Sequence, residues 1–340
     1  MANHRSALHR FFLLVTIAVA ISVLVGGALA GYWYFGPYRG FRAQAFIEIE
    51  HGMSSQEIAR QLAEKGVVRS RWAFAAIRAL HPRATLQAGE YRFGSTQTPW
   101  QVFEKIRRGE IFYDDFTVPE GSNIFDIASL LEQSDMVDSD EFLKAAANPQ
   151  LIRDLDPVAR TLEGYLFPST YRLTHNTTGK QLCNEMTREF RKHWALLGGS
   201  VLGAEAHKIV TLASLIEKET AIPQERPLVA AVFVNRLRLS MPLQCDPTTV
   251  YAALLDRRYR GVIHKSDLAS GNPYNTYAHP GLPPGPIANP GIASLKAALN
   301  PAETDYLYFV AKSDGSGSHH FSAKLLEHEK AVLAYRKNAH

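Results

Sequence analysis

The stretch LASLIEKET, residues 212–220, places two glutamates two positions apart in a segment that is otherwise largely apolar. At about 100° per residue, the side chains of Ile209, Leu215 and Ile216 fall within about 60° of Leu212 on a helical projection. This stripe predicts an amphipathic α-helix from His207 to Thr220. Burial of a glutamate is costly, so the position of each acid relative to the stripe matters.

The two glutamates project differently from this helix. Glu219 returns to within about 20° of the stripe, whereas Glu217 lies about 140° away. We therefore expect Glu217 to face solvent and Glu219 to be drawn into the protein. A desolvated carboxyl has a raised pKa, as a general acid working near neutral pH requires. Glu219 can equally be the frayed end of the helix or a buried ion-pair partner.

The N-terminus contains an apolar segment long enough to cross a bilayer. FFLLVTIAVAISVLVGGALA, residues 11–30, has no charge, and the aromatic residues of GYWYF, 31–35, follow it. A cleaved signal peptide is the alternative, because Ala28-Leu29-Ala30 fits a small-residue cleavage site. We expect an uncleaved single-pass anchor at 11–35, with residues 1–10 as a cytoplasmic tail and the rest outside.

Length and composition limit the classes of protein to which the chain can belong. The chain has 340 residues, a net charge of +4 and 46% hydrophobic residues, enough for two or three domains with their own cores. Its basic residues are dispersed, so nucleic-acid binding has no support. The two cysteines, Cys183 and Cys245, lack the spacing of a disulfide framework, and a small buried side chain explains Cys245.

Two stretches of the chain resemble each other. FIEIEHGMSSQEIARQLAEKGVVRSRWAF (46–74) and FTVPEGSNIFDIASLLEQSDMVDSDEF (116–142) each predict a strand, a glycine turn, a helix and the cap of a second helix. We expect a LysM-like repeated αβ region over 44–160, which would either grip glycan or act as a spacer. The predicted fold is α+β: a transmembrane helix, these modules, then a mixed α/β domain over 161–340 with a glutamate-bearing helix.

Three further stretches carry a family resemblance. After ASLIEKET come ERPLVAAVFVNRLRLSMPLQCDPTTVYA (225–252), YNTYAHPGLPPGPIANPGIASLKAALNP (274–301) and YLYFVAKSDGSGSHHFSAKLLEHEKAV (306–332). Together they closely resemble the YceG-like family, the endolytic murein transglycosylases (MltG). The resemblance is nearly continuous in the C-terminal half and architectural in the N-terminal half.

The resemblance implies a chemistry. Such enzymes cut the β-1,4 bond between N-acetylmuramic acid and N-acetylglucosamine inside nascent peptidoglycan strands, without water, leaving 1,6-anhydro ends. One carboxyl serves as acid and then as base, unlike the carboxylate pair of ordinary glycosidases. The family's essential glutamate corresponds to Glu219. The resemblance also implies a bacterial inner-membrane protein with a periplasmic catalytic domain, a role in setting strand length, and synthases or division proteins as neighbours.

Several polar residues are candidates for binding the glycan. They are Asn235, Gln244, Asp246, Thr248, Tyr251, Asn275, Tyr277 and His320. Asp246, before Pro247, equally suits a helix N-cap. His319 is the alternative to His320 as a polar contact near the cleft. Asn289 is expected to cap a helix over 290–299. The histidine spacings match no metal site, so we expect neither metal nor cofactor.

Two other functions remain open from the sequence. One is a non-enzymatic anchored scaffold that holds glycan and organises synthesis partners. The other is a hydrolytic muramidase, which needs a second carboxylate to activate water, and Asp246 is the candidate.

Overall fold

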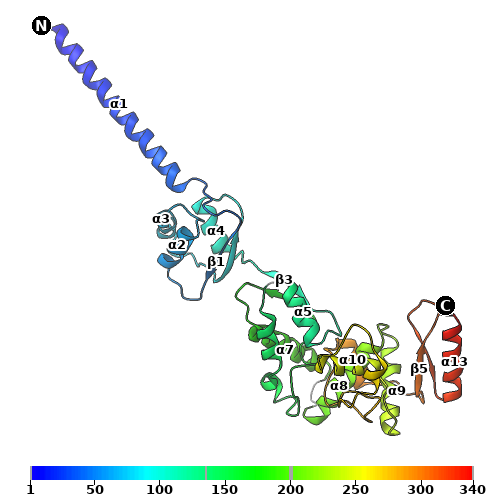
Figure 1. Cartoon of the computed structure of the whole chain (residues 1–340). Coiled ribbons are helices and arrows are strands. Elements are labelled where there is room, and N and C mark those ends of the chain that lie inside the picture. Colours follow the sequence, from blue (N-terminus) through cyan, green and yellow to red (C-terminus); the bar gives the residue numbers. More distant parts are fainter. Residues whose placement is uncertain (1, 135, 199–201, 339–340) are drawn as a thin grey trace. The chain divides into compact units, whose positions relative to one another are not determined.

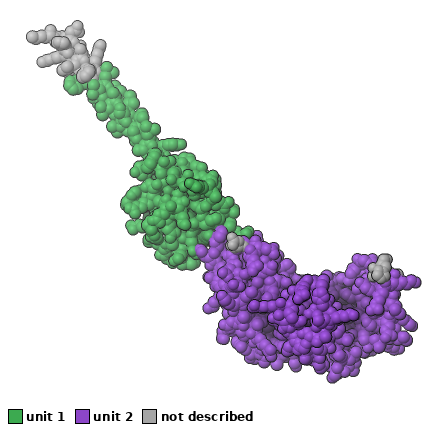
Figure 2. All heavy atoms as spheres, in the orientation of Figure 1, with its two compact units in different colours: residues 1–114 green, residues 115–340 purple. Residues whose placement is uncertain are grey.

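The computed structural model describes residues 2–134, 136–198 and 202–338, with side chains described from residue 12 to 337 within those ranges. The chain divides into two compact units, residues 1–114 and 115–340 (Figure 2). Part of the predicted tail and part of the glycine-rich segment at 195–207 lie outside the described residues. Each unit is considered by itself.

The first unit begins with a long apolar helix, α1 (Ala2–Phe35), drawn in blue in Figure 1. Its segment Phe12–Phe35 has 24 residues, a mean hydropathy of 2.6 and no burial within the protein. A helix of this length is about 36 Å long, enough to cross a bilayer core. The helix is therefore compatible with a single-pass anchor, although length and composition fit a signal sequence as well.

The rest of the first unit is a small αβ fold. Its elements are β1 (Ala45–Ile49), α2 (Ser55–Glu64), α3 (Arg71–Leu80), β2 (Gly89–Phe93) and α4 (Pro99–Arg108). β1 and β2 pair antiparallel with Ile47 opposite Tyr91. Both side chains are buried in one hydrophobic core with residues of the three helices. Alternation of buried and exposed residues along β1 thus places its apolar face on the helices.

The second unit begins with the same order of elements. They are β3 (Asp114–Thr117), α5 (Ile124–Ser134), α6 (Ser139–Ala146) and β4 (Thr170–Leu173), and β3 pairs with β4. Gly52 and Gly121 take the same place after the first strand of each copy, with φ of 84° and 76°. Side chains with a Cβ rarely adopt this left-handed conformation, so glycine suits the turn.

The predicted repeat region at 44–160 therefore spans both units. Its first copy lies in the first unit and its second copy in the second unit. The second copy also extends beyond residue 160, because β3 is paired with β4 at 170–173. The pairing of two strands more than fifty residues apart in the sequence could not be predicted from local sequence patterns alone.

Helices dominate the remainder of the second unit. They are the 3₁₀ helix η1 (Pro149–Ile152), α7 (Gly179–Leu196), α8 (Ala204–Glu219), α9 (Arg226–Arg238), α10 (Asp246–Leu255), α11 (Lys265–Leu268) and α12 (Ile292–Leu299). α8 packs against α9, α10 and α12. Its residues 210–216 are all buried, so the helix lies inside the unit.

The chain ends in a hairpin and a helix. β5 (Tyr308–Ala311) and β6 (His319–Ser322) pair antiparallel, and α13 (Leu325–Asn338) contacts both strands. β5 also contacts α9, where Phe233 meets Phe309 edge-on. The hairpin therefore connects α9 on one side with α13 on the other.

Candidate active site

Glu219 is the last residue of α8. Thr220, which follows it, has extended backbone angles, and its hydroxyl accepts a hydrogen bond from the Ile222 backbone N–H at 3.1 Å. This side-chain contact favours a turn over continued helix. A carboxylate at the C-terminal end of a helix also faces the negative end of the helix dipole. The local structure thus disfavours the charged form of Glu219.

The expected exposure of Glu217 is wrong. Its side chain is only 5% exposed and forms a 3.0 Å ion pair with Arg226, whose side chain is 8% exposed. The other carboxylate oxygen of Glu217 accepts a hydrogen bond from the Gly291 backbone N–H at 2.9 Å. Glu217 is therefore a buried acid with both oxygens satisfied. The projection failed because helical periodicity cannot show that Arg226 and Gly291, from other segments, cover the face on which Glu217 lies.

Glu219 lies in a different environment. The residue keeps partial exposure to solvent, while protein surrounds its carboxyl on most sides. In the described part of the chain, the ion pairs near this end of α8 involve Glu217 and Glu225 rather than Glu219. Burial raises the pKa of Glu219. The negative charge of Asp246 raises it further, while a hydrogen bond from the Cys245 thiol lowers it.

Two groups at the start of α10, Cys245 and Asp246, act on this carboxyl. Cys245 is buried and unpaired, and burial together with Glu219 raises the pKa of its thiol. Asp246 is exposed and accepts a 2.6 Å hydrogen bond from the Tyr277 hydroxyl. Its side chain shows no N-cap hydrogen bond, because Cys245 occupies that position. Asp246 is therefore held by Tyr277 rather than by the helix end.

Two cationic or potentially cationic side chains act on Glu219 from other elements. Arg236 of α9 donates to the carbonyls of Leu307 and Leu243 at 2.7 and 2.9 Å. His319 of β6 is fixed by Glu225, which accepts from its backbone N–H at 2.8 Å and its ring Nδ1 at 2.7 Å. His319, when it is protonated, and Arg236 lower the pKa of Glu219 through their positive charge. Since a carboxylate only accepts, Nδ1 of His319 carries a proton.

Three predicted binding residues are buried and hold loops in place. Asn235 donates to the carbonyls of Thr304 and Tyr306 at 2.7 and 3.0 Å. Asn275 donates to the carbonyls of Ser270 and Leu268 at 2.8 and 3.0 Å. Thr248 donates to the Cys245 carbonyl at 2.6 Å. Their polar groups are used within the protein, so they shape the site without facing it.

Gln244 and Tyr277 remain accessible. Gln244 is exposed and has a φ of 51°, a left-handed conformation that is uncommon for a residue other than glycine. Its backbone N–H donates to the Thr276 carbonyl at 3.3 Å. Tyr277 is 37% exposed. Like Asp246, these two residues are exposed to solvent.

A cavity of about 530 Å³ opens beside Asp246. Tyr251 contributes to its wall, although only 3% of the residue is exposed, and the Tyr251 hydroxyl donates to Glu163 at 3.0 Å. Lys218, which precedes Glu219, lines the cavity and donates to the Gly121 carbonyl at 3.0 Å. The remaining lining residues are Asn123, Phe125, Asp126, Pro247, Val250, Leu254, Tyr259, Ile263 and Ile287.

Glu163 is a fully buried acid behind that wall. It accepts hydrogen bonds from the Ile124 backbone N–H, the Tyr251 hydroxyl and the Asn289 amide, each at 3.0 Å. Burial raises its pKa to about 8. The predicted capping role of Asn289 is wrong, because its Oδ1 accepts from the backbone N–H groups of Gly164 and Leu166 instead.

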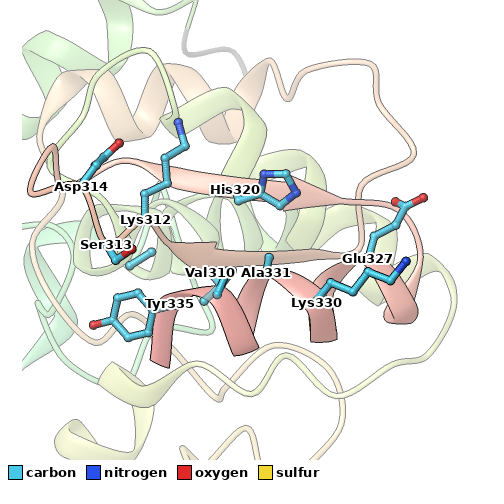
Figure 3. A pocket seen from close by; sticks show the side chains of 11 residues that line it. Val310, Lys312, Ser313, Asp314, His320, Glu327, Lys330, Ala331 and Tyr335 are labelled. Atoms are coloured by element: carbon cyan, nitrogen blue, oxygen red, sulfur yellow. The ribbon is translucent and has the colours of Figure 1, made fainter. Parts of the chain in front are cut away.

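His320 lies on the other face of β6. It is exposed, and it lines a separate cavity of about 560 Å³ between the hairpin and α13 (Figure 3). Val310, its partner in the β-ladder, and Lys330 of α13 line the same cavity. The histidine that acts on Glu219 is its neighbour, His319.

Two residues that the sequence missed are adjacent to those that it indicated. Arg236 follows Asn235, and Cys245 lies between Gln244 and Asp246. His319, which the sequence left as the alternative to His320, is the histidine that acts on Glu219. In a strand, successive side chains point to opposite faces, and in a helix they are about 100° apart. A shift of one residue along these segments therefore decides which side chain acts on Glu219.

α8 thus ends in a desolvated glutamate, and the residue before it, Lys218, lines a cavity together with Asp246. A desolvated carboxyl near a cavity is typical of enzymes that use general acid catalysis. The model of the YceG-like family matches residues 47–334. The chain belongs to the YceG-like family.

Its relatives carry a common name. A protein of Bacillus subtilis named endolytic murein transglycosylase is 32% identical over 333 residues, covering 92% of this chain and 91% of the relative. A protein of the same name from Streptococcus pneumoniae strain R6 is 27% identical over 358 residues, covering 94% of this chain and 64% of the relative. The crystal structure of a YceG-like protein from Listeria monocytogenes has a TM-score of 0.53 and 31% identity, with 84% of this chain and 98% of that chain covered.

Proposed function

We propose that this chain is an endolytic lytic transglycosylase, a carbon–oxygen lyase that cuts peptidoglycan strands between N-acetylmuramic acid and N-acetylglucosamine. The name shared by its relatives supports the reaction class. The observation that carries the proposal is Glu219: a desolvated carboxyl with a raised pKa, outside any ion pair in the described part of the chain. A carboxyl in this state can donate a proton near neutral pH.

The reaction needs only this one carboxyl. Protonated Glu219 gives its proton to the glycosidic oxygen, and the bond from that oxygen to the anomeric carbon of N-acetylmuramic acid breaks. The 6-hydroxyl oxygen of the same sugar attacks the anomeric carbon, and its proton passes to the Glu219 carboxylate. The products are a 1,6-anhydro end and a free 4-hydroxyl. Glu219 is again protonated, and no water is consumed.

The surroundings of Glu219 fit both halves of this cycle. Burial and Asp246 favour the protonated acid before cleavage. The Cys245 thiol, His319 and Arg236 stabilise the carboxylate after the proton has left. Opposing influences of this kind keep a pKa near the working pH, where both forms are accessible.

The glycan has room at Asp246, whose charge acts on Glu219. The 530 Å³ cavity is lined by Asp246, and Tyr251 and Tyr259 contribute aromatic surface to it. Gln244 and Tyr277 supply an amide and a phenol next to Asp246. We infer that sugar rings on one side of the cut occupy this cavity, and that Asn235, Thr248 and Asn275 hold its loops.

The other regions suit a membrane-anchored enzyme of the cell wall. We infer that α1 crosses the inner membrane with its N-terminus in the cytoplasm, so that the catalytic domain is periplasmic. The two βααβ copies are inferred to be LysM-like modules that contact glycan. Cutting near the membrane would limit the length of nascent strands and bring the enzyme close to peptidoglycan synthases or division proteins.

A hydrolytic muramidase is the second candidate. Its supporting observation is that the exposed Asp246 carboxylate lies close enough for its charge to raise the pKa of Glu219. A second carboxylate beside an acid is the arrangement that activates water in inverting glycosidases. In that case Asp246 would be the base.

Digestion of purified peptidoglycan by the full-length chain in detergent distinguishes these candidates. Mass spectrometry of the fragments should give 1,6-anhydro ends within the strands. Reducing ends would support the muramidase, because hydrolysis adds the mass of one water molecule at each cleaved bond. Absence of any cleavage would favour a non-enzymatic scaffold and would contradict both enzymes.

A further inference from the structure

The arginines beyond the apolar helix have no place in the proposed reaction. Arg39 and Arg42 follow α1 within seven residues, and Arg69 and Arg71 lie at the start of α3. Single-pass proteins usually concentrate such charges on the cytoplasmic side of the membrane. With the N-terminus of α1 in the cytoplasm, as proposed above, these four arginines lie on the opposite flank, where such charge is uncommon.

Arg69 joins the folded part of the first unit to the end of α1. Its guanidinium carbon lies 4.8 Å from the Trp33 ring centroid and 4.7 Å from the Tyr38 ring centroid. Both distances are within the range of cation–π interactions. Trp33 belongs to the last turn of α1. If α1 spans the bilayer, Arg69 is held at the depth of the lipid headgroups, where such aromatic rings accumulate.

Backbone hydrogen bonds fix the same region. The Gly40 N–H donates to the Gly66 carbonyl at 2.8 Å, just before Arg69. Tyr38 and Gln97 exchange two backbone hydrogen bonds, at 3.0 and 3.2 Å. The segment that leaves α1 is thus tied to two loops of the αβ fold, and the loop that carries Arg69 stays close to the end of α1.

The next residues extend this surface. The Arg71 guanidinium lies 4.8 Å from the centroid of the Trp72 ring, and Trp72 is 66% exposed. An exposed tryptophan beside an arginine has the amphipathic character of side chains at membrane interfaces. Together, Arg39, Arg42, Arg69, Arg71 and Trp72 are called the arginine face below.

The charges of this face are not neutralised within the protein. Over the described residues, none of its four arginines forms an ion pair, whereas Arg60 and Arg107 of the same unit pair with Glu57 and Glu104. Arg39 donates to the carbonyls of Arg42 and Ala43, each at 3.0 Å, which fixes the side chain without cancelling its charge. The face therefore offers positive charge to an external anion.

We propose that the arginine face binds the phosphate groups of anionic phospholipids in the leaflet from which α1 emerges. The inference rests on the proposed role of α1 as a membrane anchor. Guanidinium groups match phosphate geometry and can donate two parallel hydrogen bonds to it. Contact at this face would hold the first unit against the membrane, so α1 and the arginine face would act as two points of attachment.

The test uses the full-length chain reconstituted in nanodiscs of phosphatidylcholine, with or without phosphatidylglycerol. Amide hydrogen exchange is followed over residues 38–43 and 66–74. The electrostatic attraction of one arginine to an anionic membrane surface is enough to slow local opening of the backbone about fivefold. Amide exchange should therefore be at least about fivefold slower in nanodiscs that contain phosphatidylglycerol. High salt should remove the difference.

Matched variants identify the groups responsible. R69Q combined with R71Q should abolish the lipid-dependent difference, and R69K with R71K should retain most of it because the charge persists. R107Q with R108Q, which alters two arginines of α4 that pair with Glu104, should leave it unchanged. If exchange is equal in both lipid compositions while residues 12–35 are protected, the proposed lipid binding by the arginine face is wrong and the membrane anchor stands. A chain that does not enter nanodiscs would contradict the anchor as well.

Discussion

The Glu217 carboxylate and the Arg226 guanidinium form a 3.0 Å ion pair in which both side chains are less than a tenth exposed. Two residues further along α8, Glu219 is desolvated without such a pair. The same helix thus carries one buried acid that is neutralised and one that is kept reactive.

Glu219→Gln should remove cleavage and preserve the fold. The amide cannot donate or recover the proton, and general acid–base catalysis contributes about 10²- to 10⁴-fold to a rate. We expect cleavage to fall by at least about 10³-fold. The Tm should be unchanged or slightly raised, because the substitution removes an acid whose desolvation costs stability.

Glu205→Gln is the matched control for this variant. It changes the same functional group on the same helix, at a side chain that is 63% exposed and only loosely paired with Lys208. Its activity should remain at the wild-type level. Comparable activity in the Glu219 and Glu205 variants would exclude Glu219 as the acid.

Glu217→Gln should act on stability instead. It leaves Arg226 buried without its close partner, and Glu120 at 3.7 Å is the remaining acid. Removing one member of a buried pair costs about 3 to 5 kcal/mol, and we expect the lower end of that range. Urea denaturation measures the loss. A second variant, with Glu217→Leu and Arg226→Met together, should recover much of it, and failure to do so would show that the pair is not the source.

Asp246→Asn and Cys245→Ala should shift the pH profile of cleavage in opposite directions. Glu219 must be protonated to act, so the rate falls as pH rises through its pKa. The charge of Asp246 raises that pKa, so Asp246→Asn should move the alkaline limb to lower pH. The Cys245 thiol lowers it, so Cys245→Ala should move the limb to higher pH.

The same experiment separates the two proposed enzymes. Cleavage by a lytic transglycosylase survives Asp246→Asn with an altered profile, because the asparagine can still accept from Tyr277. Complete loss of activity at every pH would identify Asp246 as a base that activates water. Shifts of both variants in one direction would contradict the assigned electrostatics of Glu219.

The sequence predicted helices well because their signals are local. The helix expected at 207–220 is α8 at Ala204–Glu219. The predicted exposure of Glu217 was wrong because periodicity cannot show which polar positions of a helix are covered by other elements. α8 is packed against α9, α10 and α12, and Arg226 compensates the acid from another helix.

For the candidate site, the sequence indicates segments of the chain more readily than it indicates the individual side chains that face a ligand. Asn289 resembled a helix cap because it precedes Pro290, yet its amide connects Glu163, Ser122 and two backbone N–H groups far away in sequence. Asn275 resembled a sugar contact, yet its side chain is consumed by the loop it holds. A polar residue among apolar ones indicates a buried polar network as readily as a binding site, and only the long-range partners decide between them.

The final prediction concerns the pH dependence of stability through Asp156 and His207. Asp156 is fully buried and accepts from the Tyr165 hydroxyl at 2.5 Å and from His207 Nδ1 at 2.6 Å. His207 Nε2 donates to the Pro284 carbonyl at 3.0 Å. Both ring nitrogens thus face acceptors, which is the arrangement that the protonated imidazolium satisfies.

Asp156 raises the pKa of His207, and burial alone would lower it. Burial acts to raise the pKa of Asp156, but the hydrogen bonds from His207 and Tyr165 prevail and lower it. The imidazolium therefore stabilises the fold fully below the unfolded histidine pKa of about 6.5, and its contribution is lost as pH rises through the raised pKa of His207. The carboxylate contributes above the unfolded aspartate pKa of about 3.9 and is lost as pH falls through its lowered pKa. We expect the difference in Tm between wild type and His207→Gln to be greatest between these limits and to shrink on the alkaline side. A difference that stays constant from mildly acidic to alkaline pH would mean that His207 is held as a neutral ring.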